Sequence, residues 1–367
     1  MKNIVLIIPS LTIGGAEKQA YNYALEIKKH SAYNPIIIGL GKQGALIDVL
    51  NNSNIQHATF RLNQFEHQSR FSKIITLIRF IIFIKKLKPF ITISFTFWPN
   101  IISGLTWKFT GSKFNYWNQR SIDENISITF WEKIIIKLKP KYIANSYAGA
   151  NFISERHKLN KENISIIHNY IDLKESIKKP QITDDATIKF LMIANFFPEK
   201  DHKTVILAFS KYLKNNPKSK AELHFIGNVP GLSNAMIKAK ALAFELNLLK
   251  NVFFHGLVAN PSSFEIKFDI GILSTYSEGF SNTIMEYMLS KLPVIATNIP
   301  SNLELLGEAN KNWLFDIEDS DSLAEKMHLL SCDQKLRNSL GEHNFKLVTE
   351  NFNLTNFSKQ IATILYE

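Results

Sequence analysis

Short apolar runs alternate with helical stretches along the whole chain, and this alternation is what most restricts the fold. A connection between parallel strands is long enough to hold a helix, so the pattern predicts parallel sheets covered by helices on both faces. The predicted fold class is therefore α/β. Helices are expected at 17–30 and 74–88. The predicted strands are 4–8, 35–39, 91–94, 142–145 and 165–168, then 188–193, 221–226, 251–254, 270–273 and 294–296.

A polar, charged segment that contains Pro180 separates the two series of strands, at about 172–186. Such a segment is typical of a linker. A length of 367 residues suits two domains better than one core. We therefore expect domains over 1–175 and 176–350, each with a Rossmann-like sheet, followed by an apolar-spaced helix within 351–367.

Composition excludes several classes of protein. The chain has one cysteine, so a disulfide framework or a cysteine metal cluster is not expected. The apolar run after Met1 is too short for a signal peptide, and no stretch is long enough for a transmembrane helix. The ten histidines form no metal motif. The Asp319-Ser-Asp321 run resembles a metal motif, but it precedes a helix, where Asp and Ser are ordinary caps. We expect no metal and no cofactor.

The net charge of +11 is concentrated in the first half of the chain. Residues 1–180 contain 25 basic and 11 acidic side chains, whereas residues 181–367 contain 18 and 21. The segments 71–88 and 130–139 combine strongly apolar helical patterns with cations. Such helices can lie on an anionic membrane surface, although packing helices with lysines on the wet face show the same pattern. We expect peripheral binding at the cytoplasmic face of the cell membrane.

Two carboxylates eight positions apart, Glu278 and Glu286, mark the most informative segment. An apolar strand precedes them, a helical stretch carries the second, and another strand follows. The segment is therefore expected at the carboxyl end of a parallel strand, where open α/β sheets bind ligands. Its helix start is rich in capping residues, and the free N–H groups of a helix start attract phosphate. The sequence thus predicts a phosphate seat with a carboxylate at each end.

This segment resembles the E-x7-E element of retaining glycosyltransferases of family 4, which have the GT-B fold. The resemblance extends along the whole chain, and it implies that the last helix crosses back onto the first domain. It places Glu278 at the donor sugar, where it is expected to be catalytic, and Glu286 at the ribose of the nucleotide. The diphosphate is then expected to bind the backbone amides of Gly279, Phe280, Ser281, Asn282 and Thr283.

Two further loops of the second domain carry the resemblance. Family members usually have an arginine and a lysine that bind the diphosphate after the first strand of this domain. Lys200 matches the lysine and is expected to be catalytic, whereas Asn195 stands at the arginine position. The loop after 251–254 reads the base in the family, which implies backbone contacts from Gly256 and Leu257. The adjacent His255 is a weaker candidate, because a lone histidine beside a strand is usually structural.

The first domain contributes a glycine pair and a set of polar residues. Gly14 and Gly15 follow the first strand and resemble the family's Gly-Gly-Ala-Glu loop near the donor phosphate or the acceptor; a purely structural turn is the alternative. Many members have a histidine after the central strand, but 91–100 contains none. Asn118, Arg120 and Asp123 are predicted on the acceptor side instead. Arg120 suits an acceptor phosphate, with local pairing as the alternative.

The family resemblance predicts a retaining glycosyltransferase that moves a hexose or N-acetylhexosamine from a nucleoside diphosphate sugar, UDP rather than GDP. The expected acceptor is a glycan or lipid-linked glycan in cell-surface polysaccharide synthesis. A catalytically silent sugar-nucleotide-binding partner protein is the main alternative. A dinucleotide enzyme lacks its Gly-x-Gly-x-x-Gly fingerprint here. Nucleic-acid binding would explain the charge but not the two glutamates, so no nucleic-acid partner is expected.

Overall fold

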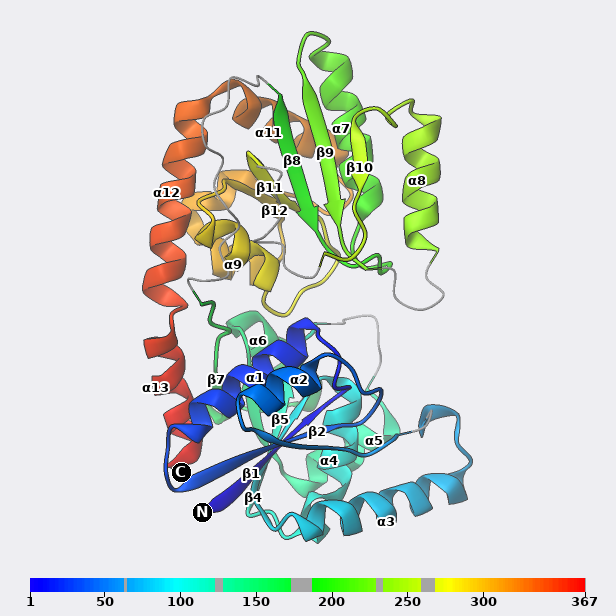
Figure 1. Ribbon diagram of the computed structural model, residues 1–367, viewed down its shortest axis with the longest axis vertical. Coiled ribbons are helices and arrows are strands. Elements are labelled where there is room, and N and C mark those ends of the chain that lie inside the picture. The colour runs from blue at the N-terminus through cyan, green and yellow to red at the C-terminus, as the bar shows by residue number, and fades with distance from the viewer. Residues whose placement is uncertain (63–64, 123–127, 173–186, 229–233, 259–267, 367) are drawn as a thin grey trace. The chain divides into compact units, whose positions relative to one another are not determined.

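The computed structural model describes residues 1–62, 65–122, 128–172, 187–228, 234–258 and 268–366. The chain divides into two compact units (Figure 1). One unit comprises Met1–Asn169 together with Phe357–Glu367, and the other comprises Tyr170–Asn356. Asp123, predicted on the acceptor side, lies outside the described residues. Each unit is built on its own parallel sheet, as the α/β prediction requires.

The first sheet has seven strands, and every neighbouring pair is parallel. The strand order reverses between the first and fourth strands, which lie side by side in the middle of the sheet. In spatial order the strands are β3 (Gln56–Thr59), β2 (Tyr33–Gly39), β1 (Lys2–Ile8), β4 (Pro89–Phe95), β5 (Phe114–Gln119), β6 (Lys141–Ala144) and β7 (Ile164–Ile166).

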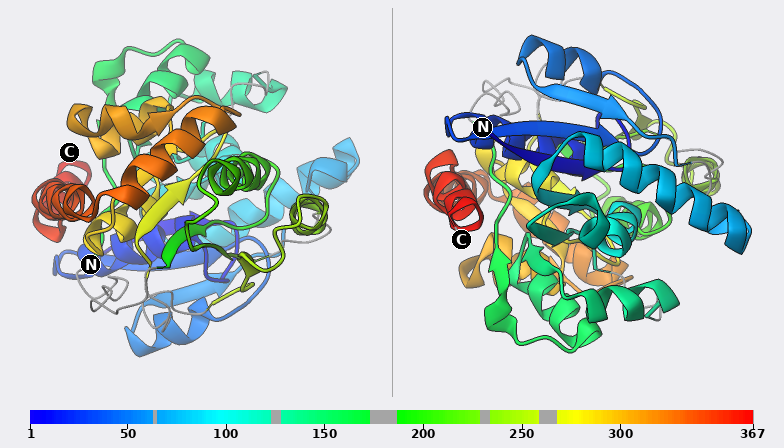
Figure 2. Two further views of the ribbon diagram at one scale, coloured as in Figure 1. Left: turned by 90° about the horizontal axis from the view of Figure 1, so that it is seen from above. Right: turned by 90° about the horizontal axis from the view of Figure 1, so that it is seen from below.

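Helices cover both faces of this sheet (Figure 2). The C-terminal helix reaches it as well: the ring of Phe357 packs on Tyr23 at 5.3 Å, and the Tyr33 hydroxyl donates to the Leu365 carbonyl at 2.5 Å. The helices that belong wholly or partly to this unit are α1 (Gly15–Lys28), α2 (Leu46–Asn52), α3 (Arg70–Lys86), α4 (Phe97–Thr110), α5 (Phe130–Leu138), α6 (Tyr147–His157) and α13 (Leu354–Leu365).

The second sheet has six strands, again all parallel, and its order reverses between β8 and β11. In spatial order the strands are β10 (Val252–Phe254), β9 (Ala221–Ile226), β8 (Ile188–Ile193), β11 (Ile270–Leu273), β12 (Val294–Thr297) and β13 (Leu314–Phe315). Its helices are α7 (His202–Asn215), α8 (Ala235–Glu245), α9 (Asn282–Leu289), α10 (Pro300–Leu306), α11 (Ser320–Cys332) and α12 (Gln334–Asn351).

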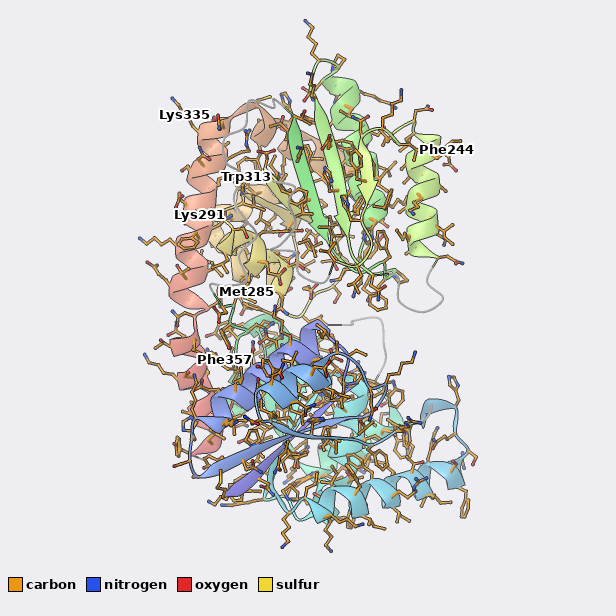
Figure 3. The ribbon with its side chains drawn as sticks, viewed as in Figure 1. Phe244, Met285, Lys291, Trp313, Lys335 and Phe357 are labelled. Atoms are coloured by element: carbon orange, nitrogen blue, oxygen red, sulfur yellow. The ribbon has the colours of Figure 1, made fainter. Side chains whose placement is uncertain are left out.

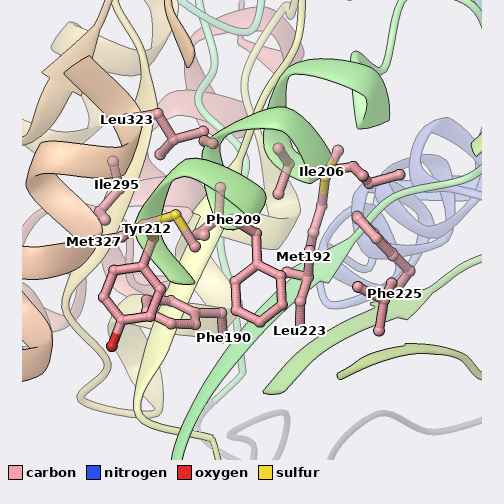
Figure 4. Packing of buried hydrophobic residues seen from close by; sticks show 14 of the residues in the cluster. Phe190, Met192, Ile206, Phe209, Tyr212, Leu223, Phe225, Ile295, Leu323 and Met327 are labelled. Atoms are coloured by element: carbon pink, nitrogen blue, oxygen red, sulfur yellow. The ribbon is translucent and has the colours of Figure 1, made fainter. Parts of the chain in front are cut away.

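Two apolar layers sandwich the second sheet. On one face, buried side chains of α7, α8 and α11 pack on alternate residues of β8 and β9, among them Phe190, Phe209 and Phe225 (Figure 4). On the other face, α9, α10 and α12 pack on the remaining residues. Phe244, by contrast, projects from α8 away from the sheet and is 69% exposed (Figure 3). The alternation of faces explains why these strands read as continuous apolar runs.

Three strands have no counterpart in the sequence-based prediction: β3, β5 and β13. Strand β5, which lies inside the first sheet between β4 and β6, reads Phe-Asn-Tyr-Trp-Asn-Gln. Its polar residues interrupt the apolar pattern by which the other strands were predicted. The structure buries these polar residues, and two of them have side-chain partners: the Ser103 hydroxyl donates to the Asn115 side-chain oxygen at 2.5 Å, and the Trp117 indole donates to the Gln119 side-chain oxygen at 2.9 Å. A buried polar residue is tolerated when it is hydrogen-bonded, and that pairing exists only in the folded chain.

Candidate functional site

Lys200 and Glu278 meet at the carboxyl edge of the second sheet. They follow β8 and β11, the two strands between which the order reverses. Open α/β sheets bind ligands at such a switch point. The Lys200 ammonium forms an ion pair with the Glu278 carboxylate and lies 3.5 Å from the Thr275 hydroxyl oxygen. Both side chains are sheltered, at 18% and 22% exposure, so a cation and an anion share one edge of the sheet.

The two loops that carry this pair are tied together along their backbones. The Thr275 hydroxyl donates to the Glu199 carbonyl at 3.0 Å, and the Tyr276 amide donates to the same oxygen at 2.9 Å. The Tyr276 hydroxyl in turn donates to Glu318 at 2.7 Å. The contribution of Thr275 and Glu318 could not be found by pattern, because both contacts join segments far apart in the sequence. These bonds hold the ion pair in a fixed place.

The segment after Glu278 leads directly into α9. Ser281 caps the helix, its hydroxyl oxygen accepting from the Ile284 amide at 3.2 Å. Gly279 and Phe280 are buried, and the Phe280 ring packs on Phe352 at 5.1 Å. The Thr283 hydroxyl donates to the Ile193 carbonyl at 3.2 Å. The helix N-terminus, with its partial positive charge, therefore begins beside the Lys200–Glu278 pair.

A buried tyrosine sets the position of α9, and with it Glu286 and Asn282, which are partly exposed on the same helix. The Tyr287 hydroxyl accepts from the Ile193 amide at 2.7 Å and lies 3.2 Å from the Leu191 carbonyl, which accepts its proton. A Cβ atom on Gly271 would come within 2.5 Å of the Tyr287 ring. Only glycine therefore lets α9 lie this close to β11.

The Asn195 side chain joins two loops by a hydrogen bond. Its side-chain oxygen accepts from the Asn228 amide at 2.9 Å, which joins the loops after β8 and β9. A Cβ atom on Gly227 would collide with the Ala194 carbonyl oxygen, so these loops approach closely. The loop after β10 joins them, because the Gly227 amide donates to the Gly256 carbonyl at 2.9 Å. The next residue, Leu257, is 71% exposed.

The remaining predicted residues belong to the first unit. Gly14 is the N-cap of α1, and Gly15 is its first residue; a Cβ atom on Gly14 would meet a Glu17 oxygen at 2.5 Å. Asn118 lies inside β5 and is fully buried. Arg120 donates to the Asn169 side-chain oxygen at 2.5 Å. Local pairing, the alternative named for Arg120 above, is thus present in the structure.

Arg120 nevertheless keeps part of its donor capacity. Its Nη1 atom is buried and has no hydrogen-bond partner within the described part of the chain. Its guanidinium lies 5.6 Å from the centre of the Phe95 ring. Burial lowers the pKa of Arg120, and burial raises the pKa of Glu17 nearby, although each charge favours the ionised form of the other. A cation and a carboxylate thus share the polar interior of this unit.

The described residues contain no group of three or more His, Cys, Asp or Glu side chains arranged to hold a metal ion. Asp319 caps α11, accepting from the Asp321 and Ser322 amides at 3.1 and 2.9 Å. Asp321 pairs with Lys211 at 2.6 Å. Both aspartates therefore have structural partners.

Residues 174–347, nearly all of the second unit, match the family model described as glycosyl transferases group 1. Two solved structures align with almost the whole chain. A glycosyltransferase from Rickettsia africae has a TM-score of 0.79 and 21% identity, covering 99% of this chain and 97% of that one. Anabaena HepE in complex with UDP and glucose has a TM-score of 0.84 and 16% identity, covering 99% of both chains.

Curated relatives agree with these matches. N-acetyl-alpha-D-glucosaminyl L-malate synthase of Bacillus anthracis is 25% identical over 226 residues, 59% of this chain and 58% of the relative. The N-acetylgalactosamine-N,N'-diacetylbacillosaminyl-diphospho-undecaprenol 4-alpha-N-acetylgalactosaminyltransferase of Campylobacter jejuni is 26% identical over 212 residues, 56% of this chain and 55% of the relative. The matched segments thus span little more than half the length of these relatives.

Two parallel α/β units of this kind constitute the GT-B fold of glycosyltransferases, which confirms the predicted fold class. Within that class, residues 174–347 match the glycosyl transferases of group 1, and the curated relatives named above agree with that match. The family suggested by the E-x7-E segment is therefore confirmed.

Proposed function

We propose that the protein transfers a hexose or N-acetylhexosamine from a UDP-sugar to a glycan or lipid-linked glycan, with retention at the anomeric carbon. The meeting of Lys200 and Glu278 beside the start of α9 carries this proposal. A sugar diphosphate offers phosphate to the cation and the helix N-terminus, and hydroxyls to the carboxylate. The cation, the helix N-terminus and the carboxylate at one sheet edge therefore favour a sugar nucleotide as the ligand.

Negative charge develops on the diphosphate as its bond to the anomeric carbon breaks. Lys200 and the amides at the start of α9 stabilise this charge, which is the usual contribution of preorganised donors in a sheltered site. Glu278 holds the donor sugar, and Glu286 on α9 grips the ribose. The acceptor hydroxyl oxygen bonds to the anomeric carbon, so the products are the glycoside, UDP and a proton. Because Asn195 is neutral, Lys200 is the one side-chain cation proposed for the diphosphate.

Related proteins support the choice of substrates. HepE structures contain UDP, glucose and UDP-glucose, and a Staphylococcus aureus TarM structure contains UDP. The named Campylobacter relative acts on a diphospho-undecaprenol-linked acceptor, and a Staphylococcus relative is a poly(ribitol-phosphate) transferase. We therefore infer a role in cell-surface polysaccharide synthesis. Gly256 and Leu257 meet the base, Gly14 and Gly15 serve the donor phosphate or the acceptor, and Arg120 serves the acceptor.

We further propose that α3 binds an anionic membrane at its cytoplasmic face. No helix among the described residues is long and apolar enough to cross a membrane. Yet α3, which lies at the periphery of the first unit in Figure 1, exposes five large apolar side chains. They accompany the cations Arg70, Lys73, Arg79, Lys85 and Lys86. The exposed apolar residues are Phe71, Ile74, Ile75, Ile78 and Ile82, at 73%, 55%, 42%, 50% and 53% exposure. Apolar area and positive charge together are what membrane-surface helices require.

A panel of UDP-, GDP- and ADP-sugars tests the proposed activity. Thermal stabilisation by a UDP-sugar, followed by its turnover or slow hydrolysis, supports a transferase. Binding without transfer or hydrolysis supports the catalytically silent partner protein instead, which Asn195 in place of a phosphate-binding arginine would favour. If no sugar nucleotide stabilises the protein, the donor site is wrongly assigned.

A further inference from the structure

Three side chains beside the proposed base-binding turn form a hydrogen-bonded chain. Glu222 and His224 lie on β9, and His255 follows β10. The His224 Nε2 atom is 3.1 Å from the Glu222 Oε2 atom, and the His224 Nδ1 atom is 2.9 Å from the His255 Nε2 atom. His224 is almost fully buried, with its side chain 2% exposed, whereas the Glu222 side chain is 31% exposed. The chain thus runs from the surface into the sheet edge.

The two imidazole rings lie end to end in nearly one plane. Their planes differ by 4°, and their centres are 5.2 Å apart, which is the N···N distance plus the two ring radii. The hydrogen bond therefore follows the in-plane lone pair of the acceptor nitrogen. Phe253 stacks on the face of His224 at 4.9 Å, and the Phe268 ring meets it at 5.3 Å and 71°. These aromatic walls leave His224 little freedom to turn.

The partners determine where each proton lies. Burial lowers the pKa of His224 and of His255, so both rings are neutral near pH 7. The Glu222 carboxylate accepts hydrogen bonds, so it requires the proton of His224 on Nε2. The Nδ1 atom of His224 is then an acceptor, and His255 must carry its proton on Nε2. The opposite arrangement would direct a bare ring nitrogen at the carboxylate.

The last ring of this chain belongs to the residue that begins the turn. The His255 amide donates to the Phe225 carbonyl at 2.9 Å, and the Gly256 carbonyl accepts from Gly227 at 2.9 Å. Gly256 has a φ of +69°, and a Cβ atom there would meet open space. Gly256 thus adopts a left-handed backbone conformation that favours glycine, and its neighbour His255 is held at both its amide and its ring.

We propose that the Glu222–His224–His255 chain is a positioning element that orients the Gly256 turn toward the base of the sugar nucleotide. This inference rests on the proposed function, because it assumes that Gly256 and Leu257 meet the base. His255 acts through the backbone of the turn, so its loss is expected to weaken nucleotide binding more than it slows turnover.

Two measurements on the full chain test the proposal. With ¹⁵N-labelled histidine, NMR should show His224 and His255 both protonated at Nε2; a proton on Nδ1 of either ring would contradict the assignment. In calorimetric titration with UDP, His255→Phe should raise the Kd about tenfold, and His255→Gln, whose amide can still donate, should recover most of the affinity. For His255→Phe the donor KM should rise similarly, with kcat changed by no more than about twofold.

His57→Phe is the matched control, since His57 on β3 bonds only to the nearby Ile55 carbonyl among the contacts described, at 3.2 Å. Thermal denaturation identifies a variant that fails to fold. If His255→Phe does not fold, the UDP affinity of His255→Gln is compared with that of the unsubstituted protein instead. If His255→Phe folds and binds UDP as tightly as the unsubstituted protein, the positioning role is refuted, whereas the proposed function is not. If the unsubstituted protein does not bind UDP, the proposed function falls, and this inference falls with it.

Discussion

Replacing Lys200 with methionine is the most direct test of the proposed chemistry. Methionine keeps an unbranched chain but removes the ammonium group that pairs with Glu278. Loss of one preorganised charge-stabilising group typically lowers kcat about 10²- to 10³-fold, or roughly 3–4 kcal/mol of activation free energy. The sheltered pair, at 18% and 22% exposure, places Lys200 where solvent cannot easily replace it, so we expect the full decrease.

Stability should change far less than activity. Glu278 keeps partial contact with water, so loss of its partner should cost about 1 kcal/mol or less in free energy of unfolding. Lys200→Arg should restore only part of the rate, because a planar fork cannot reproduce a point charge. Lys211→Met is the control, since it also removes a lysine from an ion pair of the same unit: Lys211 pairs with Asp321, between α7 and α11, and that pair is more exposed.

Steady-state transfer from a UDP-sugar, with single-turnover rates where product release is slow, measures the effect. A double-mutant cycle with Glu278→Gln measures the interaction between Lys200 and Glu278 apart from the effect of each single substitution. We expect a coupling free energy of about 0.5–3 kcal/mol. Wild-type kcat in a folded Lys200→Met protein would refute the assignment of Lys200 to the leaving group. Zero coupling would show that the ion pair has no part in the reaction.

Three further predictions concern α9, α5 and the surface. Tyr287→Phe removes the partner of the Ile193 amide and should lower the free energy of unfolding by about 1–3 kcal/mol, measured by denaturant titration; an unchanged midpoint would contradict it. In the first unit, burial would raise the pKa of Glu132, but hydrogen bonds from His157, Arg156 and Thr129 hold it at about 2. Since that folded value lies below the ordinary one of 4.5, the stabilisation is present above pH 4.5 and is lost as the pH falls toward 2. Glu132→Gln should therefore make the melting temperature less dependent on pH between 4.5 and 2. If the melting temperature of the variant falls with pH as steeply as that of the unsubstituted protein, these hydrogen bonds are not the cause of the fall. Finally, Ile78→Asp on α3 should weaken co-sedimentation with anionic liposomes about tenfold or more, whereas Phe244→Asp on α8 should not; equal effects would point to non-specific adsorption.

Most of the local structure was predictable because its signals are short-range. Strands such as β8, β9 and β11 have apolar runs that match their structural bounds. The segment rich in capping residues was predicted as a helix start, and α9 begins there, with Ser281 as its N-cap. The polar strand β5 was not predictable in this way, since its burial depends on hydrogen-bond partners from other elements. Asn118, which was predicted on the acceptor side, is fully buried inside that strand.

The sequence by itself determined the α/β class, the family and the separate segments around Lys200 and Glu278. Periodicity, caps and motifs of this kind are written in consecutive residues. Only the tertiary structure decided that these two residues, 78 positions apart, meet in an ion pair, and that His224 bonds to His255. Such contacts depend on which strands become neighbours, and that order results from burying apolar faces across the whole unit rather than from any local preference.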